Sequence, residues 1–428
     1  MLIYLKLIGT SLELTSYFQF VLINTKMKDR DILRNYCKIM FYIGSGNCWY
    51  KEDEIGNDRS LLYRAFGASL IFLYGSMTIL EIMAFTIGNF PVEEKRECLS
   101  FASSHVVVML KIFLFIFNKP LIKGLNHKIV SICEDYDDSA LMAKKYKTMK
   151  RNVISYFGIV YGTTLFYIAG GLRNMFKGSH FVTVVTYYPS FDDNSPLANF
   201  VRVLNTIILS MMMLTMIISL DSCIVMYLIM YRYKFMTLRK YFENLREEFF
   251  TLINRQEVEL ATEKMTNGLV EGIKMHSSLI RLKPEIDQAF ATFMALQVFE
   301  SSGVAVCLLL QIALSDEHVP LVVTIKIVFF VFALFFLLGL CLCNAGDITH
   351  EASKLSNAIF YCGWQSCPPR CKSAPKRNIR KLVLLAIMQA QRPPVMKAFK
   401  MLELNYATFI QVVRTTYSVF ALFYAQNK

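Results

Sequence analysis

Long apolar segments recur along this chain and limit its fold more than any other feature. A helix that crosses the hydrocarbon core of a bilayer needs about 20 mostly apolar residues. Seven segments come close to or exceed this length, at residues 65–87, 99–117, 153–172, 203–231, 290–314, 321–345 and 404–424. Only 18% of the residues are charged, which excludes a set of soluble domains. The sequence therefore predicts an all-α, polytopic membrane protein with seven transmembrane helices.

The connections between these segments differ in positive charge. The N-terminal segment and the connections 119–151, 232–286 and 346–402 hold 37 of the 46 Lys and Arg residues, whereas the opposite connections hold 5. Loops rich in Lys and Arg tend to stay on the cytoplasmic side of a membrane. We therefore predict a cytoplasmic N-terminus and an extracellular C-terminus. Neither a zinc-finger nor an RNA-binding signature accompanies the net charge of +13, so nucleic acid is not an expected partner.

The connection 232–286 is predicted to form two amphipathic helices that continue the fourth and fifth segments into the cytoplasm. Leu245 and Phe249 recur at helical spacing in the first helix, and Leu269 and Ile273 do so in the second. An amphipathic helix needs a partner for its apolar face. Two interpretations stay open, because these faces could pack within the chain or between subunits.

No sequence motif for catalysis is present, so we do not expect an enzyme. The phosphate-binding, zinc-protease and serine-nucleophile signatures are absent. Of the 11 cysteines only Cys98 lies near the predicted outer face, which excludes an extracellular disulfide framework. Cys362, Cys367 and Cys371 cluster in sequence, but their spacing is not that of a zinc finger. We predict neither a metal ion nor a cofactor.

Ionisable residues inside the predicted spans are functional candidates, because a charge in hydrocarbon is expensive. Lys111 lies near the inner end of its span and Lys326 in the outer half of its own, so both ammonium groups could reach an interface. Glu300 lies at mid-membrane, where it could pair with a cation or line a water-filled pocket; a structural role is the favoured interpretation. The full set is Glu81, Lys111, Asp221, Glu300, Lys326 and Arg414.

A ligand pocket is predicted in the outer half of the helix bundle. Aromatic and methionine side chains with a few polar groups suit small apolar ligands. Eight residues of the second, third and fourth spans are the candidates: Phe101, His105, Met109, Gly162, Phe166, Met211, Met212 and Thr215. The same residues would serve equally well in ordinary helix packing, and this alternative stays open.

The C-terminal stretch resembles that of the insect odorant receptor family. Gln391-Arg392-Pro393 resembles the family's Q-x-P turn, Leu404 to Phe409 resembles LN-x-x-x-F, and Arg414 to Ser418 resembles K-T-S-Y-S. Weaker matches extend upstream, and Gly46 with Trp49 resembles an N-terminal G-x-W. The related gustatory receptors end in T-Y-x5-Q-F, and here Phe423 stands where that glutamine would be. This difference favours the odorant receptor family, and a gustatory-type channel stays the alternative. A G-protein-coupled receptor, whose topology would be the reverse, is a more distant alternative.

The resemblance implies an odorant-gated, non-selective cation channel. Four subunits surround one pore, and a chain of this kind is a ligand-tuning subunit that assembles with the shared co-receptor. The expected location is the plasma membrane of olfactory sensory neurons, and the expected partners are a small volatile odorant, the co-receptor and membrane lipid. The implied division is a cytoplasmic segment 1–64, six helices and the pocket in 65–345, an anchor region 346–403 with a short helix 379–391, and a pore-lining helix with its tail in 404–428.

The last predicted helix carries two sets of side chains on nearly opposite faces, and only one set can face the pore axis at a given level. By the resemblance, the gate is an apolar ring formed by Val413, Tyr417, Phe420 and Tyr424, which closes by excluding water. The polar side chains are unusually numerous for a span and lie on nearly the opposite face: Thr408, Gln411, Thr415 and Ser418. We therefore expect the apolar face to gate and Arg414 to point away from the axis. The polar side chains would pack against the fifth and sixth spans or meet water where the pore widens.

Overall fold

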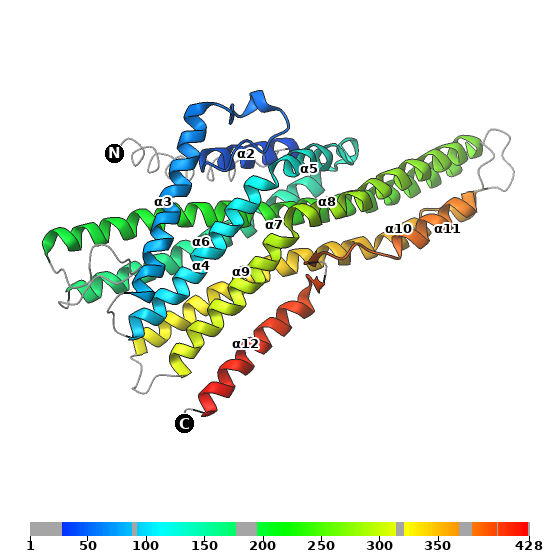
Figure 1. Ribbon diagram of the computed structural model, residues 1–428. Coiled ribbons are helices and arrows are strands. Elements are labelled where there is room, and N and C mark those ends of the chain that lie inside the picture. Colours follow the sequence, from blue (N-terminus) through cyan, green and yellow to red (C-terminus); the bar gives the residue numbers. More distant parts are fainter. Residues whose placement is uncertain are drawn as a thin grey trace.

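A computed structural model describes residues 28–87, 92–176, 195–313, 321–367, 379–399 and 401–426. Within these ranges, the side chains of residues 92–98, 174–176, 202, 205, 206, 208–213 and 322 are not described. The predictions for Met211, Met212, Cys98 and Cys371 therefore fall outside the described side chains. The described chain is almost entirely helical and is drawn out along two long helices (Figure 1).

The elements follow one another along the chain with few long connections. The first half comprises α2 (Asp29–Tyr42), η1 (Glu52–Glu54), α3 (Leu61–Thr86), α4 (Val92–Phe117), α5 (Lys119–Ser131), η2 (Glu134–Tyr136) and α6 (Ser139–Phe176). The second half comprises α7 (Pro196–Asn254), α8 (Val258–Ala313), α9 (Leu321–Ser353), α10 (Leu355–Phe360), η3 (Trp364–Ser366), α11 (Ile379–Ala390), β1 (Lys397–Ala398), β2 (Leu402–Glu403) and α12 (Tyr406–Gln426).

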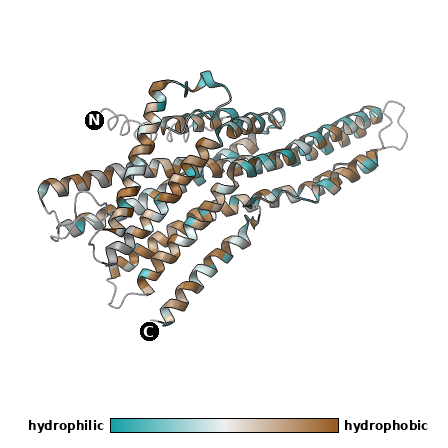
Figure 2. Ribbon diagram, viewed as in Figure 1, coloured by the Kyte–Doolittle hydropathy of each residue, from teal (hydrophilic) through white to brown (hydrophobic). Residues whose placement is uncertain are grey.

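Six helices of the described chain are long and apolar enough to cross a membrane. They are α3, α4, α6, α7, α8 and α9, and they contain the first six predicted spans. Apolar residues gather where these helices run side by side, whereas the distant ends of α7 and α8 are more hydrophilic (Figure 2). The seventh predicted span coincides with α12, which is not among the six because its polar side chains lower its hydropathy. The spanning role of α12 stays a prediction.

The two amphipathic helices predicted in the connection 232–286 are confirmed as continuations of the spans. α7 and α8 are single helices of 59 and 56 residues, and they form the long antiparallel pair in Figure 1. Two glycines of α8 permit their close approach, because a Cβ atom at Gly268 would lie 2.5 Å from Leu245 and one at Gly272 would lie 2.4 Å from Phe242. α7 is also the most deeply buried candidate span, with 89% of its apolar window covered. It is the central element against which α6, α8 and α9 pack.

Helix α2 packs against α6 and α7 through a buried ion cluster. Asp29 lies between Lys145 of α6 and Lys234 of α7, and its Oδ2 atom is 3.1 Å from the Lys234 ammonium. All three side chains are buried. Burial alone would raise the pKa of the Asp29 carboxyl, but the attraction of both lysines holds that pKa below its usual value.

The G-x-W segment that follows α2 has a clear structural role. Gly46 has a φ of +92°, a backbone conformation that favours glycine. Trp49 is completely buried, and its Nε1 atom donates a hydrogen bond of 3.0 Å to Glu54. This segment therefore fixes the turn between α2 and α3.

A short antiparallel hairpin redirects the chain between α11 and α12. Lys397 of β1 pairs with Glu403 of β2, and Ala398 pairs with Leu402. The backbone N–H of Leu404 then donates to the carbonyl of Met396. The hairpin sets the direction in which α12 leaves, along α8 and α9 (Figure 1).

Candidate ligand site and the buried charges beside it

Three aromatic rings from three helices form a cluster in the predicted pocket region. The ring centre of Phe101 in α4 lies 5.3 Å from that of Tyr167 in α6 and 5.8 Å from that of Phe330 in α9. Tyr167 and Phe330 are 5.4 Å apart. The ammonium group of Lys326 lies 4.2 Å from the ring centre of Tyr167, which adds a cation–π contact to the cluster.

His105 lies one turn along α4 from Phe101 and is tied to α3. Its Nδ1 atom is hydrogen-bonded to the carboxylate of Glu81, and both side chains are buried. The backbone carbonyl of His105 also accepts a hydrogen bond of 3.3 Å from the hydroxyl of Tyr74. His105 therefore lies beside the aromatic cluster, but its ring is already engaged with α3.

The structure does not bring all the predicted pocket residues to one place. Met109 faces α3, because a Cβ atom added at Gly75 would lie 3.6 Å from its methyl group. A Cβ atom at Gly162 would contact nothing within 4 Å. Phe166 is 41% exposed and contacts Phe329, which points it away from the Phe101 cluster. Thr215 is half-buried in α7.

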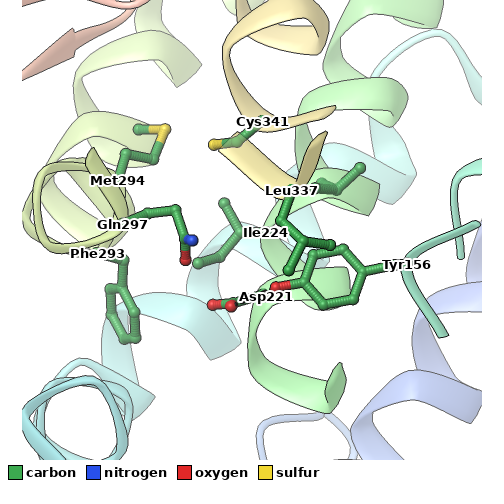
Figure 3. A pocket seen from close by; sticks show the side chains of 9 residues that line it. Tyr156, Asp221, Ile224, Phe293, Met294, Gln297, Leu337 and Cys341 are labelled. Atoms are coloured by element: carbon green, nitrogen blue, oxygen red, sulfur yellow. Dashed lines mark hydrogen bonds between the residues drawn. The ribbon is translucent and has the colours of Figure 1, made fainter. Parts of the chain in front are cut away.

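A small cavity lies between α6, α7, α8 and α9, next to the partners of Lys111. Its volume is only about 10 Å³, which is room for about one water molecule. Asp221, Tyr156 and Gln297 supply its polar atoms, and the rest of the lining is apolar or a thiol (Figure 3). The hydroxyl of Tyr156 donates a hydrogen bond of 2.6 Å to Asp221. None of the predicted pocket residues lines this cavity.

The position expected for Lys111 at the membrane interface is wrong. Its side chain is only 2% exposed, and its ammonium group lies 2.9 Å from Glu300 and 3.3 Å from Asp221. It also donates to the Oε1 atom of Gln297. A buried ammonium is stable only where acceptors replace its water shell, and carboxylates from α7 and α8 do so here. Glu300 accordingly pairs with a cation rather than standing as a neutral structural residue.

The gate residues predicted in α12 lie on one side of the helix. The ring centres of Phe420 and Tyr424 are 5.6 Å apart, and those of Tyr417 and Phe420 are 6.4 Å apart. Tyr417 is 64% exposed, whereas Val413 is half-buried. This arrangement is compatible with the predicted gate but does not test it.

Two positions were predicted for the polar side chains of α12, and only Thr408 fits packing against the fifth and sixth spans. Thr408 is buried, but Gln411, Thr415 and Ser418 are exposed, as is Arg414. The buried or half-buried side of α12, which meets α8 and α9, is formed by Thr408 together with Phe409, Val412 and Thr416. Both the polar residues and Tyr417 therefore remain available on the uncovered side.

The comparison with protein families decides the identity of the chain. The model of the family described as 7tm odorant receptor matches residues 92–417, which is well over half of the sequence. The chain belongs to the insect odorant receptor family. The resemblance found in the C-terminal motifs is confirmed, and the protein is a multi-pass membrane receptor and not an enzyme.

Individual relatives agree with this assignment. The receptor is 28% identical over 170 residues to Odorant receptor 2a of Drosophila melanogaster, and the match spans 39% of this chain and 40% of that relative. Its fold is similar to the structure of the olfactory receptor OR5 from Machilis hrabei, with a TM-score of 0.69, 12% identity and coverage of 92% of this chain and 99% of that one. The OR5 complex with eugenol gives a TM-score of 0.67 at 14% identity with the same coverage. At these identities the likeness to OR5 concerns the fold alone.

The residues of this receptor that sequence reasoning missed are mainly those that pair across helices. Tyr167, Phe330 and Tyr156 have no distinguishing pattern, because aromatic residues are common throughout the spans. Lys111, Asp221 and Glu300 did carry a signal, since two acids and a base inside spans invite pairing. Among the residues that the structure describes, no group of three or more His, Cys, Asp or Glu side chains could hold a metal ion.

Proposed function

We propose that this receptor is the ligand-tuning subunit of an odorant-gated, non-selective cation channel. In this proposal it assembles with the co-receptor into a tetramer in the plasma membrane of olfactory sensory neurons. Its N-terminus is cytoplasmic and its C-terminus extracellular. The main support is the family match over residues 92–417. The fold shared with OR5, whose structure is known with eugenol, is consistent with it.

The proposed ligand is a small volatile molecule, and the proposed contact point is the Phe101 cluster. Three rings from α4, α6 and α9 offer an apolar surface, and the nearby Lys326 ammonium and His105 add polarity. Binding sites for small ligands combine apolar walls with a few polar groups. A ligand that prefers the open state shifts the gating equilibrium by its difference in affinity for the two states.

The test records cation currents evoked by a panel of volatile compounds. It compares cells that express this chain with the co-receptor and cells that express each subunit alone. The two subunits together should give odorant-evoked cation current, whereas this chain alone should give none. Phe101→Ala should then raise the half-maximal odorant concentration by about tenfold, as expected for about 1.4 kcal/mol of lost contact. Phe332→Ala is the matched control, because Phe332 lies on α9 but is 55% exposed. A compound that opens the co-receptor directly should work equally in both variants.

The gate in α12 has a separate test. Phe420→Ala should increase the current in the absence of odorant, because a smaller side chain weakens an apolar constriction. Unchanged basal and odorant-evoked currents would remove Phe420 from the proposed gate.

A further inference from the structure

Polar side chains join α4 to α8 along most of the length of α4. The four contacts begin at Ser100 and end at Asn118, the residue that directly follows α4. They cover roughly 27 Å at 1.5 Å per residue, which is close to the thickness of a bilayer core. They are Gln311 to Ser100 (3.4 Å), Ser104 to Glu300 (2.6 Å), Lys111 to Glu300 (2.9 Å) and Asn118 to the Ala289 carbonyl (3.0 Å).

We call these four contacts the α4–α8 seam. Lys111 extends the seam to two further helices. Its ammonium group donates to Asp221 of α7 as well as to Glu300 of α8. Tyr156 of α6 in turn donates to Asp221, and Figure 3 shows the two side chains meeting beside the cavity. The buried Lys111 ammonium therefore connects α4 to α7 and α8, and Asp221 connects this group to α6 as well.

Separation of α4 from α8 at this level would be strongly unfavourable. It would leave the Glu300 carboxylate without the Lys111 ammonium and the Ser104 hydroxyl, and Lys111 with only one of its two carboxylates, in a region from which water is largely excluded. The seam therefore resists sliding or parting of these two helices more than apolar contacts would, since apolar side chains can exchange neighbours freely in lipid.

The two helices joined by the seam also reach the two functional regions. α4 carries Phe101 one turn before Ser104, and α8 packs directly against α12. We propose that Lys111 and Ser104 are positioning residues that make α4 and α8 move as one body, so that ligand contact at Phe101 acts on α12 through α8. This inference rests on the proposed function, because it uses the same ligand site and the same pore helix.

Two adjacent serines provide a matched test. The Ser104 hydroxyl crosses to Glu300, whereas the Ser103 hydroxyl donates to the Ser100 carbonyl of its own helix. In cells with the co-receptor, the maximal odorant current is divided by the current from a direct co-receptor agonist. Ser104→Ala should lower this ratio by about fivefold, the size of a modest coupling between sites, and Ser103→Ala should leave it unchanged. Equal ratios in the two variants at equal surface amount would overturn the proposal.

Charge variants test the Lys111 contact independently. The combination Lys111→Met, Asp221→Asn and Glu300→Gln removes all three charges while keeping similar side-chain sizes. It should reach the surface and keep the agonist current, yet lose most of the odorant current. The exchange Lys111→Glu with Glu300→Lys restores opposite charges across the seam and should recover the ratio. A neutral variant with a normal ratio would show that the charges serve folding only. Loss of odorant response in the unsubstituted chain would instead count against the proposed function.

Discussion

Two buried ion clusters in this receptor have opposite compositions. In the first, the single cation Lys111 lies between the carboxylates of Asp221 and Glu300, inside the helix bundle. In the second, the single carboxylate of Asp29 lies between Lys145 and Lys234, where α2 meets α6 and α7. Each cluster joins three helices through one central group. The central group is therefore the vulnerable member of each cluster, because its removal leaves two like charges buried side by side.

The surroundings of the two clusters differ. Lys111 lies among candidate membrane spans, where nothing but other protein groups can replace its partners. The lysines around Asp29 have a second acid nearby, since Asp137 is close enough to both for their charge to act on it. Loss of the central group should therefore be more damaging in the first cluster than in the second. Four predictions test this comparison, in order of decreasing effect.

The largest effect is expected for Lys111→Met. Removing one partner from a buried ion pair typically destabilises a protein by about 3–5 kcal/mol, and here two carboxylates are left unpaired. The purified receptor should lose much of its thermal stability, as measured by the folded fraction that survives heating in size-exclusion chromatography. Lys147→Met on α6 is the control, because Lys147 is exposed. Equal melting of both variants would contradict a paired Lys111.

A smaller loss is expected for Asp29→Asn. The substitution leaves Lys145 and Lys234 buried without their shared carboxylate, but Asp137 partly compensates. We expect a destabilisation of about 3 kcal/mol, at the lower end of the range for a broken buried pair. The same heating assay measures it. A loss larger than that of Lys111→Met would reverse the ranking of the two clusters.

Tyr156→Phe should have a moderate effect. It removes the hydroxyl that donates to Asp221 but leaves the bond from Lys111 to that carboxylate intact. We expect a loss of about 1.5–3 kcal/mol, which is typical for one missing hydrogen bond to a charged group. Tyr146→Phe, on the same helix, supplies the control in that assay, because the buried Tyr146 hydroxyl has no hydrogen-bond partner among the described residues. A loss equal to that of Lys111→Met would mean that the hydroxyl, and not the ammonium, holds Asp221.

The smallest effect concerns pH and is specific to the Asp29 cluster. The pKa of Asp29 is held below the usual 3.8. A carboxyl with a lowered pKa stabilises the fold above its unfolded pKa, and this contribution disappears as the pH falls through the folded value. Between about pH 5 and about pH 3, the unsubstituted receptor should therefore lose more stability than Asp29→Asn. An equal loss of stability in the two proteins over this pH range would show that Asp29 does not contribute in this way.

Much of the fold could be predicted because membrane helices follow from composition over short windows. Residues 65–87, 153–172 and 321–345 needed only their apolar length, and each lies within or almost within one helix of the structure. The extensions of α7 and α8 were equally accessible, since the apolar residues Leu245 and Leu269 recur at helical spacing. The family could be inferred from motifs near the C-terminus for the same reason, because each motif is contiguous.

The candidate site could be predicted only in part. Phe101 and His105 lie one turn apart on α4, as helical spacing predicts, but their partners Tyr167, Phe330 and Glu81 come from other helices. Phe166 precedes Tyr167 by one residue, yet it points outward, and helical periodicity does not reveal which of the two faces the cluster. The rotation of a helix about its axis depends on the neighbours it packs against.

The sequence by itself determined that the chain contains helices long and apolar enough to span a bilayer, and that a few acids and lysines lie within them. It also determined the family, through motifs that a few consecutive residues carry. Only the tertiary structure decided that Lys111 meets Asp221 and Glu300, and which side of α12 stays uncovered. The physical reason is that hydrophobicity acts on each segment separately, whereas an ion pair or a packed face depends on two segments far apart in the chain and on their relative rotation.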